Sequence, residues 1–274
     1  MISAEDLGHW QQALDRIVRG TPWLRDGVAL DSCGSTQDEC RVRSSGTPGM
    51  LVTTLTQTRG RGRPGRSWDH DALCGLAVTV SVADHLADIA SIAAGLAAAR
   101  AAATHTVGPA SARIGVKWPN DVVIRESSTG DEPNADPALR KIAGVLVEAA
   151  DGILMVGIGL NVRATGVPVA GRTSIEAESL ASSPPPDRMA VLVTLIDQLW
   201  AHLSMSHDEL RARWAEADRL VGLRRGFVCD GREYQGTVLA IDPFDCIRLE
   251  LEPGRVVAIP SRLATPLDGY GVRS

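Results

Sequence analysis

A chain of 274 residues with 44% hydrophobic and 22% charged side chains can bury one sizeable core and add a small second domain. This composition excludes a disordered or fibrous protein, and the formal net charge of -5 argues against a protein that binds polyanions over its whole surface. No segment has the length and apolar character of a membrane span, and residues 1–6 lack the basic-then-apolar order of a signal peptide. We therefore expect a cytoplasmic protein with no membrane partner.

The cysteines form an odd set of five without a C-x-x-C pair: Cys33, Cys40, Cys74, Cys229 and Cys246. Neither a disulfide framework nor a zinc site fits this spacing. We expect reduced, mostly buried thiols and no metal site built by the protein itself.

The first two thirds of the chain predict one helix and then a mixed α/β region. Apolar residues recur at helical spacing over residues 3–19 behind Ser3, a suitable N-cap, and one helix is too short for a helix-turn-helix domain. Apolar runs predict strands at 50–56, 75–82, 122–124, 142–149 and 153–160, and the Ala-rich segment 84–104 predicts a buried helix. Residues 125–139 have turn composition, so we expect a loose hairpin tip there.

The last third changes from helices to short strands. Helices are predicted at 189–204 and 207–220, after the Ser-Ser-Pro-Pro-Pro breaker at 182–186. Short apolar runs at 227–229, 234–241, 247–251 and 256–259 then alternate with turns. This rhythm predicts a small β-barrel, with a domain boundary near residue 221.

Lysine is almost absent: of 28 Lys and Arg residues, only Lys117 and Lys141 are lysines. An ammonium is a compact charge and a guanidinium is a planar fork, so the two are not interchangeable at a crowded anionic centre. Surface lysines spared by codon bias would be scattered in polar loops. These two each adjoin an apolar run, which favours a functional role.

Residues 57–68 read Gln-Thr-Arg-Gly-Arg-Gly-Arg-Pro-Gly-Arg-Ser-Trp. Glycines let backbone N–H groups approach phosphate or carboxylate oxygens, and arginines add bidentate contacts. The Walker A pattern is absent. An Arg/Gly tract can also bind nucleic acid, but this one is single, lies between two predicted strands and belongs to an acidic protein. The segment therefore favours a loop that binds a small anion.

A second glycine motif, Gly157-Ile-Gly159-Leu-Asn161, ends the fifth apolar run. It lacks the third glycine and the following helix of a dinucleotide fingerprint, so a Rossmann fold is not indicated. Glycines at a strand end mark a close approach of ligand or backbone, and the Asn161 amide can offer a donor and an acceptor to a heterocycle.

Together these segments resemble the biotin protein ligases over about residues 27–267. The resemblance is carried, in the family's order, by Ser35-Thr36, Gln57 with the 60–66 loop, Lys117-Trp-Pro-Asn-Asp121, Lys141-x-Ala-Gly144 with Glu148, and Gly157-x-Gly-x-Asn161. It implies an α+β fold: a mixed β-sheet catalytic domain flanked by helices, like the class II tRNA synthetase core, with a small C-terminal SH3-like β-barrel. The implied division is an N-terminal helix at 1–20, a ligase domain at 21–220 and the barrel at 221–274.

The resemblance also implies a reaction. Biotin is activated with ATP to biotinyl-5′-AMP and then attached to one lysine of a biotin carboxyl carrier domain of an acyl-CoA carboxylase, with Mg²⁺ accompanying ATP. Family members that repress transcription carry an N-terminal helix-turn-helix domain. Because only one helix is predicted there, we expect a monofunctional ligase with no nucleic-acid partner.

The family pattern implies residue roles. Biotin-binding residues would be Ser35, Thr36, Gln57, Gly60, Arg61, Arg63, Gly144 and Gly157; ATP- or adenylate-binding residues would be Arg61, Arg63, Arg66, Trp68, Lys117, Asn120, Lys141, Gly159 and Asn161. Lys141 and Arg63 would be catalytic, because a carboxylate and an α-phosphate repel each other unless cations lie where they meet. Asp121 resembles the carboxylate that orients or deprotonates the acceptor lysine, although an aspartate here could equally end a turn.

Three residues depart from the family pattern. Gln37 stands where Asn usually follows Ser-Thr, Arg59 replaces a small residue, and Pro64 occupies the variable loop position. We expect Gln37 to reshape the biotin pocket slightly and Pro64 to stiffen a loop that orders over the adenylate.

Two alternatives remain. Lipoate ligases and lipoyl or octanoyl transferases share a related fold and act on carrier lysines, but are not expected to combine G-R-G-R-x-G-R with K-W-P-N-D. The other alternative is a nucleic-acid-binding module built on the Arg/Gly loop.

Overall fold

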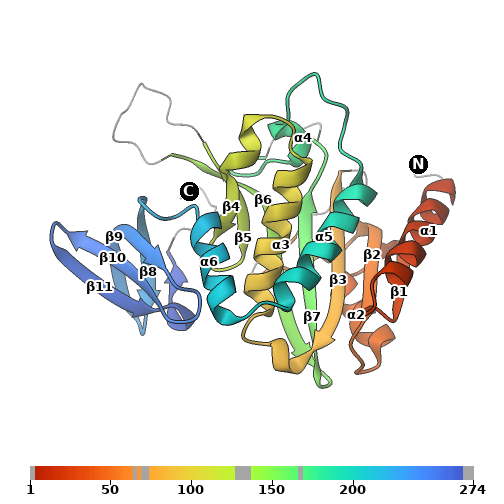
Figure 1. Cartoon of the computed structure of the whole chain (residues 1–274), viewed down its shortest axis with the longest axis horizontal. Helices are drawn as coiled ribbons and strands as arrows, with labels where there is room; N and C mark the ends of the chain where they lie inside the picture. Colours follow the sequence, from red (N-terminus) through yellow and green to blue (C-terminus); the bar gives the residue numbers. More distant parts are fainter. Residues whose placement is uncertain (1–3, 64–66, 69–73, 127–136, 166–168, 268–274) are drawn as a thin grey trace.

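A computed structural model describes residues 4–63, 67–68, 74–126, 137–165 and 169–267. Its centre is a seven-stranded sheet in the order β1-β2-β3-β7-β6-β5-β4 (Figure 1). The strands are β1 (Asp26–Cys33), β2 (Met50–Gln57), β3 (Gly75–Ala83), β4 (Ile114–Lys117), β5 (Asp121–Arg125), β6 (Leu139–Ala150) and β7 (Ile153–Asn161). Only β1 and β2 pair in parallel; the other neighbours are antiparallel, so the sheet is mixed as predicted.

The parallel pair requires a crossover, which α2 (Thr36–Ser44) provides. Ser35 caps this helix by accepting a hydrogen bond from the backbone N–H of Gln37 at 3.3 Å. The cap sets Thr36 beside the end of β2, where its backbone N–H donates to Gln57 Oε1 at 2.9 Å. The crossover thus delivers polar residues to one end of the sheet.

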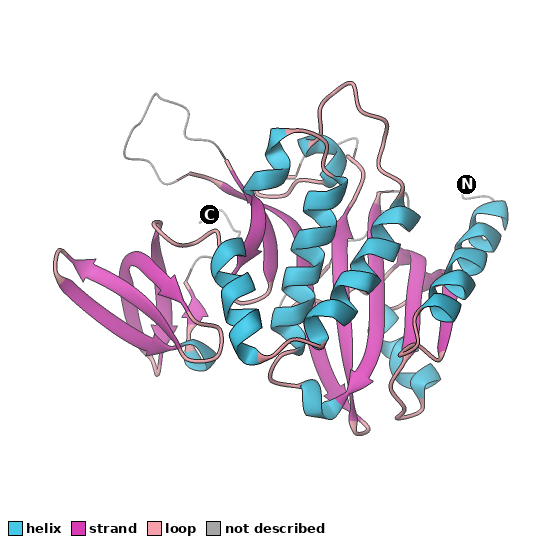
Figure 2. Ribbon diagram, in the orientation of Figure 1, coloured by secondary structure: helices cyan, strands magenta, loops and turns pink. Residues whose placement is uncertain are grey.

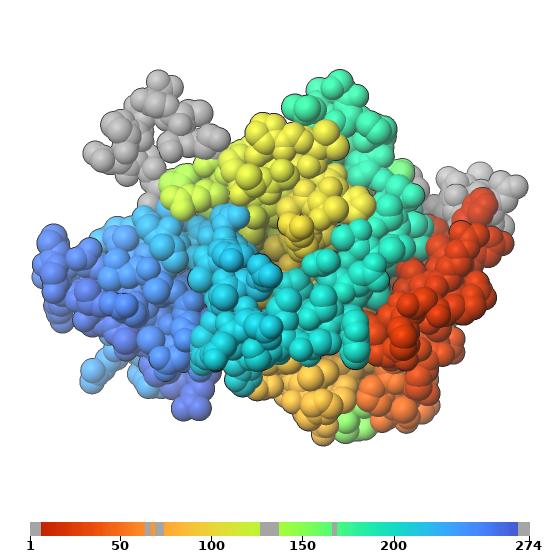
Figure 3. All heavy atoms as spheres, in the orientation of Figure 1, coloured from red at the N-terminus to blue at the C-terminus, as the bar shows by residue number. Residues whose placement is uncertain are grey.

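Helices cover one face of the sheet (Figure 2). They are α1 (Ala4–Gly20), α3 (Ala90–His105), α5 (Arg188–Leu203) and α6 (His207–Ala217), with short helical turns η1 (Asp84–Leu86), η2 (Pro109–Arg113) and α4 (Ile175–Glu178). Most of α3 is alanine and buried, and such short side chains let the helix pack closely on both β6 and α5. Figure 3 shows this helical face closed over the sheet.

The C-terminal residues form a five-stranded sheet in the order β11-β10-β9-β8-β12 beside α6 (Figure 3). Its elements are β8 (Arg224–Cys229), β9 (Arg232–Ile241), β10 (Cys246–Glu252), β11 (Arg255–Pro260), η3 (Ser261–Leu263) and β12 (Thr265–Pro266). Arg211 of α6 joins this sheet through Asp242, with Nε 3.0 Å from Oδ2, and the His207 and Phe244 rings stack at 4.4 Å. The second sheet is therefore packed against the helical layer.

Arg219 connects the end of α6 to the large sheet. Its five N–H donors bond to the carbonyl oxygens of Ala112, Arg113, Ile114, Glu216 and Asp218, at 2.7–3.2 Å. Gly115 leaves the space, since a Cβ there would collide with Ala217 O and lie 2.8 Å from the guanidinium. A guanidinium with every donor bonded to backbone fixes the end of α6 against β4.

The predicted strands are confirmed as β2, β3, β5, β6 and β7 and as β8 to β11, and the predicted helices as α1, α3 and α5. The helix predicted at 84–104 starts later than expected, because α3 begins at Ala90 and residues 84–86 form the separate turn η1. The predicted helix 207–220 was too long: α6 ends at Ala217, because the Asp218 carboxylate accepts from the N–H groups of Leu220 and Val221 and turns the chain. Ser3 and most of the predicted hairpin tip, residues 127–136, lie outside the described residues. At its base, Arg125 pairs with Leu139.

Three elements, β1, β4 and α2, were not predicted from the sequence. β1 is an edge strand with polar residues such as Asp31 on its exposed side, and β4 has only four residues. α2 is polar and short, and its burial pattern follows no clear apolar period. The five cysteines form no disulfide among the described residues, and burial raises the pKa of the Cys40 thiol to about 12. Among the described residues, no helix is long and apolar enough to cross a membrane.

Candidate active site

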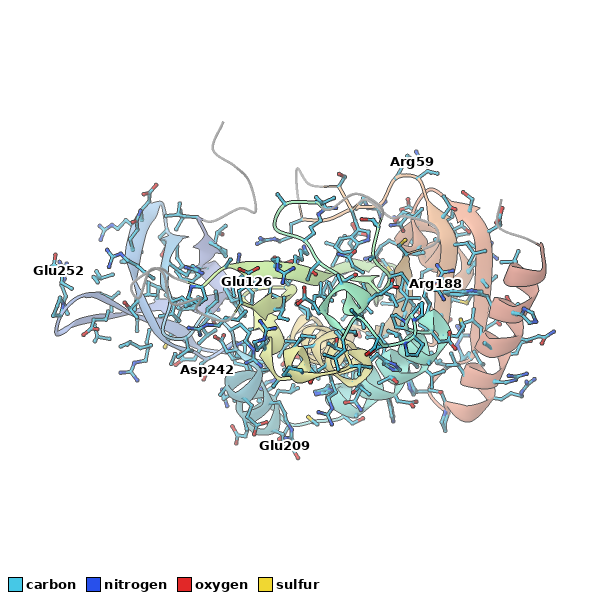
Figure 4. All side chains as sticks on the ribbon, turned by 90° about the horizontal axis from the view of Figure 1, so that it is seen from above. Arg59, Glu126, Arg188, Glu209, Asp242 and Glu252 are labelled. Carbon is cyan, nitrogen blue, oxygen red and sulfur yellow. The ribbon has the colours of Figure 1, made fainter. Side chains whose placement is uncertain are left out.

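A cavity of about 520 Å³ opens at the sheet. Figure 4 shows Arg59, near the base of the Arg/Gly loop, on the side of the sheet away from α3 and α5. The lining residues expected from the sequence are Thr36, Gln57, Arg61, Arg63, Trp68, Asn120, Asp121, Lys141, Gly144, Gly157 and Gly159. Segments far apart in the chain therefore meet in one cavity.

Lys141 and Asp121 form an ion pair in this cavity. The Lys141 Nζ lies 2.5 Å from Asp121 Oδ1, and the two side chains are 20% and 6% exposed. Asp121 is the first residue of β5, directly beside Gly144 of β6. A buried carboxylate paired with a lysine is not a turn residue on the surface. Lys117 is also buried, at 7% exposure, so neither lysine is one of the scattered surface lysines that codon bias would leave.

Three glycines of β6 and β7 line the cavity: Gly144, Gly157 and Gly159. Gly144 of β6 faces Gly159 of β7, and the Trp68 indole lies so close to both that a Cβ on Gly159 would overlap the ring. The Lys141 ammonium lies 5.4 Å from the same ring centroid. Gly157 likewise makes room for Gln37, whose Nε2 would lie 2.6 Å from a Cβ at 157. The glycine motif is thus a packing surface for two side chains that line the cavity.

The Arg/Gly loop is tied down at its base. Trp68 N–H donates to Gly60 O at 2.9 Å, and Arg61 bridges Ser67. The Arg61 guanidinium bonds to Asp38 at 2.8 Å and to Glu148 at 2.9 Å, which lowers the pKa of Asp38 and raises the pKa of Arg61. Arg61 is therefore held between two carboxylates at the edge of the cavity.

Two side-chain amides donate hydrogen bonds to neighbouring backbone carbonyls of β6. Gln37 Nε2 donates to Leu146 O at 2.9 Å, and Asn120 Nδ2 donates to Val145 O at 2.6 Å. Successive carbonyls of a strand point to opposite sides, so the two amides approach β6 from its two edges. In both, the side-chain oxygen is buried and bonded to no donor in the described structure.

Other predicted site residues do not line the cavity. Ser35 is the buried N-cap of α2, Gly60 closes the loop base, and Lys117 ends β4. Asn161 donates to Thr173 O at 2.9 Å. Arg66 lies outside the described residues, as does part of the loop expected to order over the adenylate.

One cation of the cavity, Arg172, was not predicted from the sequence. Its neighbours are bonded to the backbone of Lys141: Lys141 N–H donates to Gly171 O at 2.8 Å, and Thr173 N–H donates to Lys141 O at 2.9 Å. This parallel bridge directs the side chains of Lys141 and Arg172 to the same side, and both line the cavity. The only signal in the sequence was one more arginine among many, outside every motif.

The comparisons with known proteins agree with this architecture. A family model described as the biotin/lipoate A/B protein ligase family matches residues 34–163. A curated relative from Mycobacterium tuberculosis, named biotin–[acetyl-CoA-carboxylase] ligase, is 28% identical over 257 residues, 89% of either chain. A relative of the same name from Paracoccus denitrificans is 32% identical over 144 residues, 50% of this chain and 54% of that one.

Solved structures share the fold. A biotin protein ligase from Aquifex aeolicus, in complex with biotin and ATP, matches with a TM-score of 0.68 at 22% identity over 90% of this chain and 100% of that one. A biotin protein ligase from Leishmania major, in complex with biotinyl-5-AMP, matches with a TM-score of 0.52 at 21% identity over 85% and 98%. The chain therefore has the fold of these biotin protein ligases.

Over residues 34–163 the chain is similar to the biotin/lipoate A/B protein ligase family, and both curated relatives are named biotin–[acetyl-CoA-carboxylase] ligases. The resemblance to biotin protein ligases that the motifs predicted is thereby confirmed.

Proposed function

We propose that this chain is an ATP-dependent biotin protein ligase, which makes biotinyl-5′-AMP and transfers the biotinyl group to a lysine of a biotin carboxyl carrier domain of an acyl-CoA carboxylase. One observation carries the proposal: a single cavity brings together the polar residues after β1, the Arg/Gly loop, the Lys141–Asp121 pair and the glycines of β7. The named relatives and the biotin, ATP and adenylate complexes of the structural neighbours support it.

In the first step, a biotin carboxylate oxygen attacks the α-phosphorus of ATP and pyrophosphate leaves. Both reactants are anionic, so cations placed where they meet lower the barrier. We assign this role to Lys141 and Arg63, which line the cavity, with Arg61 and Arg172 as further cations. Thr36, Gln57 and Gly157 would hold the biotin ring, and Trp68 and Gly159 would contact the nucleotide.

In the second step, the acceptor lysine attacks the acyl carbon and AMP leaves. That amine must lose a proton, although a free lysine has a pKa of about 10.4. We assign its orientation and deprotonation to Asp121, the carboxylate that lines the cavity. Because Asp121 is bonded to Lys141, the acceptor amine competes with the ammonium of Lys141 for the same oxygen atoms.

Mg²⁺ would enter as the complex with ATP. Among the described residues, no group of three or more His, Cys, Asp or Glu side chains could hold a metal, and Asp121 already bonds to Lys141. Mg²⁺ commonly binds through substrate phosphates with few protein carboxylates, so this site fits a metal that arrives on the substrate.

We further propose three parts for the chain: an N-terminal helix at 1–20, the ligase domain at 21–220 and a C-terminal domain at 221–274. The C-terminal sheet, in which β12 returns to pair with β8, supports an SH3-like barrel. We also propose that the protein acts in the cytoplasm, where ATP is available.

Lipoate ligation is the alternative within the same family. The decisive experiment incubates the purified protein with ATP, Mg²⁺ and either biotin or lipoate, and detects the acyl adenylate by mass spectrometry. We expect biotinyl-5′-AMP, followed by biotinylation of a carrier domain. Adenylation of lipoate but not of biotin would overturn the proposal.

A further inference from the structure

A second cavity of about 510 Å³ opens on the helical face of the molecule, where α3 lies between α5 and α6 (Figure 1). The helix α3 contributes small apolar side chains and Arg100 to its wall, α5 contributes His202, and α6 contributes Arg213. None of the described residues that line it also lines the active-site cavity. The chain therefore has a second concave site, to which no step of the proposed reaction is assigned.

His202 is part of the wall of this second cavity, and α5 itself orients the ring. The Nδ1 atom lies 2.7 Å from Gln198 O, and a backbone carbonyl can only accept, so Nδ1 carries the proton. In the neutral ring Nε2 is then an acceptor, and no donor among the described residues bonds to it. The residue is 7% exposed, yet Nε2 is not one of the unpaired atoms that the described structure encloses completely. A ligand in the cavity can therefore reach this nitrogen.

Arginines outnumber carboxylates around the second cavity. Its described lining includes Arg100, Arg213 and Arg219. Glu216 is the one carboxylate among the described lining residues, and η2 and β4 add no titratable group there. The Glu216 carboxylate pairs with Arg213 at 3.3 Å, whereas no ion pair joins Arg100 to any described residue. The cavity is therefore positive even while His202 is neutral.

We propose that the second cavity binds a small organic anion, whose carboxylate or phosphate group lies between Arg100, Arg213 and Nε2 of His202. Guanidinium groups bind both headgroups with paired N–H donors, and apolar surroundings strengthen such contacts. Leu96 and Ile114 of the same wall offer an apolar surface to the body of the ligand. The site lies outside the active-site cavity, so the inference does not depend on the proposed function.

Charge links binding at this site to pH through His202. Burial, and after it the charges of Arg213 and Arg100, lower the pKa of His202. An anion between the arginines offsets their repulsion, so the pKa of the ring rises when the anion binds, and the imidazolium then donates to the anion from Nε2. A group whose pKa rises on binding makes binding tighter as the pH falls. The site should therefore bind anions more tightly in mild acid.

The test uses hexanoate and hexyl phosphate, with hexanol as the uncharged molecule of the same chain length. Titration of the isotope-labelled protein, followed by amide chemical shifts, measures each affinity and locates each probe. We expect both anions to shift amides of α3, α5 and α6, and hexanol to bind at least about tenfold more weakly, because it makes no charge-assisted contact. The anion that binds more tightly identifies the headgroup as carboxylate or phosphate.

Arg100→Gln should weaken the binding of both anions by about tenfold. Its matched control is Arg16→Gln, which removes the charge of an exposed arginine on α1, outside the cavity. Hexanoate stays ionised above about pH 6, so its affinity for the unmodified protein should increase from about pH 7.5 to about pH 6 as His202 takes up a proton. His202→Gln should abolish that increase.

The inference is overturned if hexanol binds as tightly as the anions, or if either anion leaves the amides of α3, α5 and α6 unshifted. Equal affinities of Arg100→Gln and Arg16→Gln for both anions would overturn it as well. A hexanoate affinity that is the same at both pH values contradicts the place of His202 in the site.

Discussion

The ammonium of Lys141 lies 2.5 Å from the carboxylate of Asp121, so the cation proposed for adenylation and the base proposed for transfer are bonded to each other. Each sets the position and charge of the other. Substitution of either residue therefore acts on both steps, and the steps must be assayed separately.

Lys141→Ala should reduce adenylate formation by at least about 100-fold, the usual loss when one group that stabilises developing charge is removed. Lys141→Arg should also be slow, because a planar fork does not fit beside Asp121 and Trp68. Asp121→Asn should keep more adenylate synthesis than transfer, since it leaves Lys141 charged. Pyrophosphate release and single-turnover transfer from preformed adenylate measure the two steps.

Lys117→Arg, outside the cavity, should be the milder change. Lys141→Arg at the rate of the unmodified enzyme would contradict the assignment, and so would an Asp121→Asn variant that loses only the first step.

Arg172→Gln should raise the KM for ATP by about tenfold or more, because a charge-assisted contact contributes about 1.5–3 kcal/mol. Arg172 lies beside Lys141 in the cavity, whereas Arg163 of the same connection is exposed and does not line it. Arg163→Gln is therefore the control. Initial-rate kinetics with ATP varied at saturating biotin check the prediction, and equal KM values for the two variants would refute it.

Gly159→Ala should weaken nucleotide binding, because the new methyl group occupies the space of the Trp68 indole. Overpacking of this kind costs about 1–3 kcal/mol. Binding of ATP should fall accordingly, while the fold persists by circular dichroism. Gly8→Ala is the control, because a methyl group there meets nothing within 4 Å. Gly152→Ala would not serve, since that glycine has a φ of +77°. Full ATP binding by Gly159→Ala would show that the indole can move at no cost.

Arg219→Lys should destabilise the protein by about 2–4 kcal/mol, because one ammonium cannot replace five donors and several buried carbonyls lose their partners. Burial lowers the pKa of Arg219, in agreement with its enclosed position. Arg213→Lys is the control: Arg213 is exposed and has a 3.3 Å ion pair with Glu216, a class of contact that contributes little. Urea unfolding should separate the two variants, and equal midpoints would contradict the role of Arg219.

The stability of the protein should fall in mild acid through His202. Burial lowers the pKa of His202 below 6.5, and the charges of Arg213 and Arg100 lower it further. The hydrogen bond between the ring and Gln198 O, at 2.7 Å, acts in the opposite direction but does not outweigh burial. Below about pH 6.5 the imidazole is protonated in the unfolded chain but stays neutral in the folded protein. The free energy of unfolding is therefore highest above about pH 6.5 and declines as the pH falls below that value. His202→Gln should flatten the melting temperature between pH 7.5 and pH 5. An equal decline in both proteins would assign the effect to other groups.

The sequence predicted the long apolar strands and the Ala-rich helix because their burial follows a regular period. It could not reveal β1 and α2, whose polar residues are explained only by their place at the edge of the sheet and at the cavity. In the site, the lysines and glycines could be found from their unusual positions. Arg172 could not, since its relation to Lys141 depends on two backbone bonds across a connection of some thirty residues. The hydrogen bond from Asn161 to Thr173 O was likewise set by a tertiary contact.

The hydrogen bonds of the Asn120 and Gln37 amides to β6 have a consequence for engineering. Asn120 and Gln37 bond to the carbonyls of Val145 and Leu146, so one rigid strand sets the spacing of both ends of the cavity. The side chain on α2 can be exchanged without altering that strand. A ligase with a new acid as its substrate could therefore be sought in libraries confined to residue 37 and its neighbours, while the end that carries Lys141 and Asp121 keeps its geometry.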